Sequence, residues 1–205
     1  MRVGLSAYLM HQGVDYRAAG VSTYAVQLLR HLPLTAPEHE YVSFQGSDAP
    51  TQAGVETAIA PVATLKPGWR IPWEQAGLPI SARRRRIELL HGTVNVIPLL
   101  AGMPTVVTVH DLAFLRVPGR FPPMKQRYLA LAVRAGTARA AKIIAVSEQT
   151  RRDLIELLGV APEKISTVYS GVDESFQPVD RETSESFRRQ AMGNRPYVLH
   201  VGTLE

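Results

Sequence analysis

The stretch TVVTVHDLAFL, residues 105–115, decides the fold of this chain. Its first five residues, 105–109, are rich in β-branched side chains and apolar on both faces, which is typical of a central strand in a parallel sheet. The polar pair His110 and Asp111 follows directly. In an open parallel sheet, ligands bind beyond the carboxyl ends of the strands, so this pair lies where a functional site is expected.

Strands and helices alternate on both sides of this segment. Helical apolar spacing is found over residues 20–32, 73–86, 122–140 and 148–158, and residues 181–191 form a polar helix or linker. Further strands are expected over residues 2–9, 41–45, 55–60, 88–91, 142–146, 165–169 and 197–201. This alternation predicts an α/β fold, a doubly wound and mainly parallel sheet.

Three local features of the helices can be predicted. Pro33 and Pro37 should end the first helix. Ser147 should cap the helix that follows it, and Gly159 should end that helix in a left-handed conformation. The buried stripe of the helix over 122–140 should consist of Met124, Tyr128, Leu131 and Ala135.

Composition excludes several classes of protein. The chain has 205 residues, of which 45% are hydrophobic and 20% charged, as in a globular domain. It has no cysteine, which excludes a disulfide scaffold, a thiolate metal site and a cysteine nucleophile. No apolar run reaches the roughly 18 residues that span a bilayer. The N-terminus resembles a first strand more than a signal peptide, so a cytoplasmic location is expected.

The charge balance is 23 − 18 = +5, which favours anionic partners such as phosphates, nucleotides or lipid headgroups. The excess is too small to indicate nucleic-acid binding, and no zinc spacing or other nucleic-acid-binding motif occurs. The cluster Arg83-Arg84-Arg85-Arg86 has two interpretations. One is a solvated helix end, and the other is a contact with an anionic membrane surface or a phosphate.

Candidate functional residues follow the ends of the expected strands. They include three histidines, which suit proton transfer and hydrogen bonding near neutral pH. The Gly-x-Gly-x-x-Gly motif of dinucleotide-binding domains, the Walker A motif and Gly-x-Ser-x-Gly are all absent. No carboxylate cluster indicates a metal. The candidates are His11 and Gly13, His91 and Asn95, His110 and Asp111, Ser147, Ser170 and Gly171.

Four stretches together resemble a known family. They are AAGVSTYAVQLLRHL (18–32), TVVTVHDLAFL (105–115), AKIIAVSEQTRRDLIELLGVAPEKISTVYSGVD (141–173) and YVLHVGTLE (197–205). In this order they resemble the N-terminal half of retaining, nucleotide-sugar-dependent glycosyltransferases of family 4. The resemblance implies the Rossmann-like, acceptor-side half of a GT-B fold. One departure is Ser170, where the family usually has Asn before the Gly-Val-Asp turn.

The resemblance also implies a domain division. Residues 1–180 should form the acceptor-side domain, and residues 181–205 a linker and the first strand of a nucleotide-sugar-binding domain that this chain lacks. In the family that second domain carries the cations for the donor diphosphate. The exposed strand Tyr197–Val201 should then be disordered, fold onto the first domain, or pair with a second copy in a homodimer.

The resemblance assigns a catalytic role to His110, over the reaction centre. Gly20, Asp111, His91, Asn95 and Ser147 are the substrate-binding candidates. Four of these residues have a structural alternative. His110 and Asp111 could cap backbone groups, Gly20 could be a turn glycine, and Ser147 could serve only as a helix cap. Neither a metal nor a cofactor is expected.

The function implied is transfer of a sugar from a nucleoside-diphosphate sugar to an acceptor hydroxyl with retention. The acceptor is a glycan, a lipid-linked molecule or a small molecule, and contact with the inner face of the membrane is one interpretation of the arginine cluster. The isolated chain should be inactive because the donor cations lie in the other half. The alternative is a non-catalytic domain that binds a glycan or an anionic glycolipid.

Overall fold

The computed structural model describes residues 1–10, 20–64, 66–117, 119, 121–193 and 195–200. The expected candidates His11 and Gly13 lie outside the described residues. The chain divides into two compact units, Met1–Tyr169 and Ser170–Glu205. Each unit is described separately.

The first unit contains a parallel sheet, as the sequence predicted. The strand order is β3-β2-β1-β4-β5-β6-β7, and every pairing among the described residues is parallel. The order reverses direction between β1 and β4, which makes the carboxyl ends of these strands the topological switch point. The strands are β1 Arg2–Ser6, β2 Glu40–Gln45, β3 Val55–Ile59, β4 Leu89–Gly92, β5 Thr105–Val109, β6 Lys142–Ala145 and β7 Ile165–Thr167.

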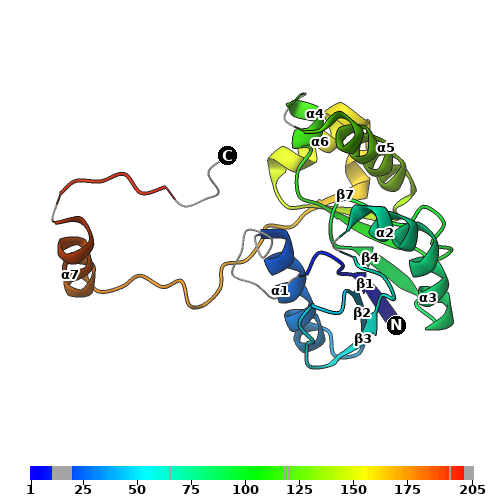
Figure 1. Cartoon of the computed structure of the whole chain (residues 1–205), viewed down its shortest axis with the longest axis horizontal. Coiled ribbons are helices and arrows are strands. Elements are labelled where there is room, and N and C mark those ends of the chain that lie inside the picture. Colours follow the sequence, from blue (N-terminus) through cyan, green and yellow to red (C-terminus); the bar gives the residue numbers. More distant parts are fainter. Residues whose placement is uncertain (11–19, 65, 118, 120, 194, 201–205) are drawn as a thin grey trace. The chain divides into compact units, whose positions relative to one another are not determined.

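Helices cover both faces of this sheet (Figure 1), so the doubly wound class is confirmed. On one face, α1 packs Ala25 and Leu29 against Val3 and Leu5 of β1. On the other face, α3 packs on β2 and β4, while α5 and α6 pack on β5 and β6. The helical segments are α1 Gly20–Thr35, α2 Pro67–Pro72, the π-helix η2 Trp73–Gly77, α3 Leu78–Arg84, α4 Ala113–Arg116, α5 Pro123–Arg139, α6 Glu148–Leu158 and the short η3 Pro162–Lys164.

The predicted ends of α6 are confirmed. The hydroxyl oxygen of Ser147 accepts a hydrogen bond from the backbone N–H of Thr150 at 3.1 Å, as an N-cap does. Gly159 has φ 68°, the left-handed conformation expected just past the last turn.

The predicted stop at Pro33 is wrong, because α1 continues to Thr35. A proline in a last turn removes one backbone donor but leaves the preceding carbonyls free to bond elsewhere. The hydroxyl of Thr35 donates to the carbonyl of His31 at 3.0 Å and satisfies one of them.

The predicted buried stripe of α5 is also wrong. Met124 and Leu131 are 85% and 71% exposed, whereas Val133, Gly136 and Thr137 are buried. The helix approaches the sheet through small side chains, and a Cβ at Gly136 would lie 3.2 Å from Ile97 Cγ1. Close approach of the backbone therefore decides the orientation of α5.

Residues 67–84 are helical throughout, although they contain Gly77 and Pro79, residue types that commonly interrupt a helix. Pro79 is the second residue of α3, directly after the π-helical turn η2. Gly77 lets the ring of Trp73 lie against its backbone, since a Cβ there would be 2.0 Å from Trp73 Cε3. The result is a π-helical turn, a feature that is rare and frequently found at functional sites.

The second unit contains the helix α7, Arg181–Met192, capped by Asp180 and ended by Gly193. Residues 197–200 form no strand, contrary to the prediction, and Val201 lies outside the described residues. A strand needs a neighbouring strand for its backbone hydrogen bonds, and none of the described strands pairs with these residues. The division at residue 180 that the resemblance implies stays a prediction.

Among the described residues, no helix is both long enough and apolar enough to cross a bilayer.

Candidate functional site

The candidate site lies at the switch point, where β1 and β4 end side by side. The hydroxyl of Thr93, the first residue after β4, donates to the carbonyl of Ser6 at the end of β1 at 2.6 Å. Thr93 is fully buried. This bond fixes the carboxyl ends of the two central strands relative to each other.

His110 follows β5 directly and is held at three points. Its backbone N–H donates to Asn95 Oδ1 at 2.8 Å, and its carbonyl accepts from the hydroxyl of Thr150 at 3.0 Å. Its Nε2 lies 2.9 Å from the carbonyl oxygen of Thr93. Because a carbonyl only accepts, Nε2 carries a hydrogen. In the neutral ring Nδ1 is then an acceptor, and no described residue hydrogen-bonds to it.

A polar network supports the His110 ring from the α1 side of the sheet. The ring of Tyr24, on α1, meets the imidazole edge to face, with the centroids 5.0 Å apart. The hydroxyl of Tyr24 hydrogen-bonds Thr108 Oγ1 at 3.0 Å. Thr108 Oγ1 also bonds His91 Nε2 at 2.8 Å. His91 and Thr108 share one face because His91 is in register with Val106.

His91 is neutral at physiological pH. Burial, together with a smaller contribution from the neighbouring His110, lowers its pKa to about 4. The buried, neutral imidazole of His91 therefore has a structural role, because it hydrogen-bonds Thr108 beneath the site. His91 is linked to His110 through Thr108, which hydrogen-bonds both His91 and Tyr24, and through the ring contact of Tyr24 with His110.

Asn95 and Asp111 shape the backbone around His110. Asn95 has φ 49°, a left-handed conformation that asparagine tolerates. This conformation lets its backbone N–H bond the carbonyl of Thr108 at 2.8 Å while its side chain holds the N–H of His110. Asp111 Oδ1 accepts from the N–H of Ala113 at 2.9 Å. The geometry thus matches the turn-capping interpretation of Asp111, and Asn95 orients His110.

Gly20 is exposed at the start of α1, one helical turn before Tyr24. A rise of 1.5 Å per residue places the beginning of the helix about 6 Å along its axis from Tyr24. Because Tyr24 touches His110, the start of α1 faces the same region as the imidazole.

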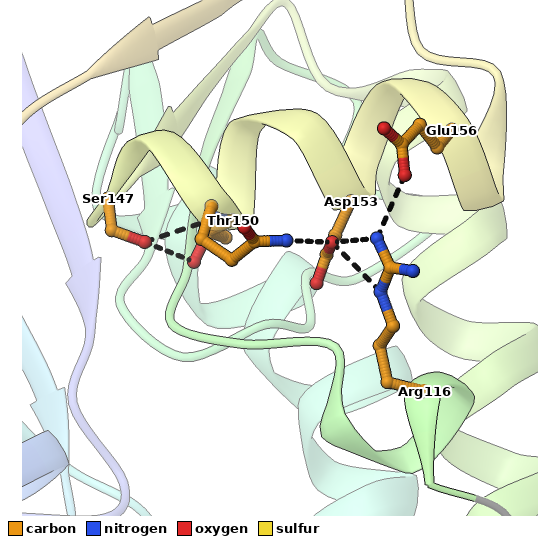
Figure 2. A network of polar contacts seen from close by, with 6 residues as sticks. Arg116, Ser147, Thr150, Asp153 and Glu156 are labelled. Carbon is orange, nitrogen blue, oxygen red and sulfur yellow. Dashed lines mark hydrogen bonds and ion pairs between the residues drawn. The ribbon is translucent and has the colours of Figure 1, made fainter.

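The loop that carries His110 is anchored to α6 at two places, and Figure 2 shows the one around Arg116 and Asp153. At one end, Thr150 bonds the carbonyl of His110, and Ser147 caps the same turn. At the other end, Arg116 Nε donates to Asp153 Oδ1 at 3.0 Å, and its Nη2 donates to Glu156 at 2.8 Å. The oxygen of Ser147 is thus used by the helix cap.

Several residues of this site were not predicted. The helical spacing of apolar residues over 20–32 makes Tyr24 look like a core residue, and nothing in the sequence marks Thr93, Thr108 or Arg116 as special. One signal was overlooked: Glu74 is the only carboxylate between residues 57 and 87. The structure buries it, and burial raises its pKa to about 7. Within the described ranges, no three His, Asp or Glu side chains are grouped so that they could hold a metal ion.

Comparison with known proteins gives a family and a set of folds. The model of a family described as Glycosyltransferase Family 4 matches residues 18–176. The D-inositol 3-phosphate glycosyltransferase 1 of Catenulispora acidiphila is 34% identical over 89 residues, which are 42% of this chain and 21% of that protein.

Two solved structures are similar in fold. Sucrose-phosphate synthase from Thermosynechococcus elongatus has a TM-score of 0.67 at 16% identity, covering 95% of this chain and 53% of that one. The Anabaena protein HepE in complex with UDP and glucose has a TM-score of 0.56 at 16% identity, covering 93% and 50%. The chain thus spans about half the length of these structures, and the first unit is the N-terminal half of a GT-B fold.

Proposed function

The chain belongs to Glycosyltransferase Family 4, and from this premise we propose that it is the acceptor-side part of a retaining glycosyltransferase. The full-length enzyme moves a sugar from a nucleoside-diphosphate sugar to an acceptor hydroxyl. The bond between the anomeric carbon and the diphosphate breaks, and its electron pair leaves with the diphosphate. The acceptor oxygen bonds the same face of that carbon, and its proton passes to the leaving phosphate.

The observation that carries the proposal is the state of His110. Its Nε2 is used by the carbonyl of Thr93, while no described residue hydrogen-bonds to its Nδ1. The ring stands at the switch point, the usual place for ligands in an open parallel sheet. We assign to Nδ1 a hydrogen bond with a hydroxyl of the donor sugar, which orients the anomeric carbon toward the acceptor.

The substrate-binding candidates divide by geometry. Asn95 and His91 act on His110 through the bonds described above, and Ser147 and Asp111 cap the turns beside it. Gly20 offers the open start of α1 to a phosphate or a hydroxyl. The cations that receive the leaving diphosphate belong to the second domain, so no metal or other cofactor is required.

The acceptor is a polyhydroxylated molecule, free or carried by a glycan or a lipid. The name of the Catenulispora relative, which specifies D-inositol 3-phosphate, supports a cyclic polyol that in that protein carries a phosphate. A location in the cytoplasm, with contact at the inner face of the membrane, is part of the same proposal. Of the arginine cluster, Arg85 pairs with Glu56 at 2.6 Å, so Arg83, Arg84 and Arg86 are the exposed members left for an anionic surface.

The test is transfer by the full-length enzyme with His110→Ala. We expect turnover to fall by about 10²-fold or more, the usual effect of losing one positioned hydrogen-bonding group in a transition state. His31→Ala is the matched control, because His31 is exposed on α1 and the one hydrogen bond of its ring to a described residue is with the carbonyl of Gln27. Unchanged turnover in a folded His110→Ala enzyme, or robust transfer by the 205 residues alone, would contradict the proposal.

The alternative function is a non-catalytic domain that binds a glycan or an anionic glycolipid. The same assay separates the two, because such a domain would bind its ligand without any sugar transfer by the full-length protein. The position of His110 at the switch point favours the enzyme.

A further inference from the structure

Glu74 is a buried carboxylate that the site around His110 does not use. Its side chain lies in the π-helical turn η2, and the residue is only 8% exposed. Among the described residues, no hydrogen bond or ion pair reaches its oxygens. A buried charge without a partner is costly, which is why burial raises the pKa of Glu74 to about 7.

The turn that carries Glu74 is held on both sides. Trp73 Nε1 donates to the hydroxyl of Tyr8, two residues beyond β1, at 2.9 Å. Gln75 bonds the carbonyl of Ile97 at 3.2 Å and the N–H of Leu99 at 3.0 Å. Neighbours on either side of Glu74 are therefore fixed to the loops that follow β1 and β4, and the carboxylate has a defined position.

Three other polar groups interact electrostatically with this carboxylate: Tyr8 in the turn after β1, Arg70 on α2 and Tyr128 on α5. Burial is the main cause that raises the pKa values of Tyr8 and Tyr128, and the charge of Glu74 adds to both. Burial likewise raises the pKa of Glu74, and the charge of Arg70 opposes that rise. The Tyr8 hydroxyl accepts from Trp73, and its own hydrogen has no acceptor among the described residues. For the side chains of Arg70 and Tyr128 the described residues likewise supply no hydrogen-bond partner.

The chemistry of the cluster selects a class of ligand. It offers a strong acceptor in Glu74 and donors in Tyr8, Tyr128 and Arg70. An anionic ligand is disfavoured by Glu74, and a cationic one by Arg70. A hydroxyl group suits both sides, because it donates to the carboxylate and accepts from the phenols or the guanidinium. Tyrosine rings also provide the apolar surface that a ring-shaped polyol can lie against.

Resting on the proposed function, we infer that Glu74 with Tyr8, Tyr128 and Arg70 forms a subsite for hydroxyl groups of an uncharged polyol or sugar acceptor. The loop over residues 93–99 links the subsite to the reaction centre. It bonds His110 through Thr93 and Asn95, and it bonds the Glu74 turn through Ile97 and Leu99. Acceptor hydroxyls remote from the reacting one are thereby held relative to His110.

The test is binding of myo-inositol to the 205-residue chain labelled with ¹³C at the glutamate carboxyls. The Glu74 signal is assigned by its disappearance in Glu74→Gln. We expect saturating myo-inositol to lower the pKa of Glu74, because a hydroxyl that donates to the carboxylate favours its ionised form. Cyclohexanol, the same ring with one hydroxyl, should not produce this shift.

Three variants sharpen the result. Glu74→Gln should weaken binding of myo-inositol about tenfold or more, the effect of losing a hydrogen bond to a charged group. Tyr8→Phe should weaken binding of myo-inositol several-fold. This variant tests the subsite if Glu74→Gln does not fold. Glu163→Gln, which alters an exposed carboxylate in η3, is the matched control and should bind as the parent does.

A Glu74 titration that myo-inositol leaves unchanged would overturn the inference, and so would equal affinities for the parent, Glu74→Gln and Tyr8→Phe. Ordered water would then fill the cluster. The experiment contains no donor, so its outcome is independent of sugar transfer. Loss of transfer with intact binding would refute the proposed function and leave the subsite standing.

Discussion

At the scale of single residues, burial acts on two titratable side chains in opposite directions. It lowers the pKa of His91 from 6.5 to about 4 and raises the pKa of Glu74 from 4.5 to about 7. The folded protein therefore holds both groups neutral at mildly acidic pH. As pH falls from 6.5 to 4, the unfolded chain gains a proton on His91 and the fold loses stability. As pH rises from 4.5 to 7, the unfolded chain loses a proton from Glu74, and again the fold loses stability.

Glu74→Gln should reveal the second of these contributions. The free energy of unfolding of the variant, minus that of the parent, should rise by about 3 kcal/mol between pH 4.5 and 7 and stay constant above that range. Groups common to both proteins, His91 included, cancel in this difference. Urea unfolding at a series of pH values measures it. A difference that does not vary with pH would mean that Glu74 ionises in the fold as it does in water.

At the scale of secondary structure, strands were easier to predict than the faces of helices. The β-branched run over residues 105–109 strongly favours a β-strand. The strand β5 has those same bounds. Helix α5 has apolar side chains around much of its circumference, so periodicity selects no single stripe. Its orientation follows from the closeness of Gly136 to Ile97, which is a tertiary contact. The π-helical turn was missed for a related reason, because Gly77 and Pro79 read as helix breakers.

The orientation of α5 can be tested with two substitutions. Val133 is fully buried, and Val133→Ala should lower the free energy of unfolding by about 2 kcal/mol through lost burial and a cavity. Leu131 is 71% exposed, and Leu131→Gln should change stability by no more than about 0.5 kcal/mol. Urea unfolding of both variants gives the comparison. A larger loss of stability in Leu131→Gln than in Val133→Ala would mean that α5 packs on the sheet through the predicted stripe. That stripe consists of Met124, Tyr128, Leu131 and Ala135.

At the scale of the whole molecule, the sequence predicted where the site lies but not how it is built. Residues at the ends of parallel strands share one edge of the sheet, which is why His91, Asn95, His110 and Asp111 come together. Their partners come from elements distant in sequence. Tyr24, Thr93 and Thr108 gain their roles from register and packing, which no local pattern encodes.

The division into two units predicts that the first unit folds and is stable without the second. The three hydrophobic clusters of the described residues contain only side chains from residues 1–169. The second unit instead exposes apolar side chains, among them Val172 at 79%, Phe176 at 78% and Val198 at 98%. Removing residues 170–205 therefore takes away no described part of these clusters.

We expect the chain 1–169 to unfold in urea at the same midpoint as the 205-residue chain, within experimental error. The denaturant dependence should also change little, because it follows the surface that unfolding exposes, and most of that surface belongs to the sheet and its helices. Sedimentation should show less self-association in the shorter chain, since exposed apolar side chains promote association. The matched control is a chain shortened after residue 193, which keeps α7 but removes residues 197–200. If 1–169 failed to fold while 1–193 folded, residues 170–193 would be part of the first unit and the division would be wrong.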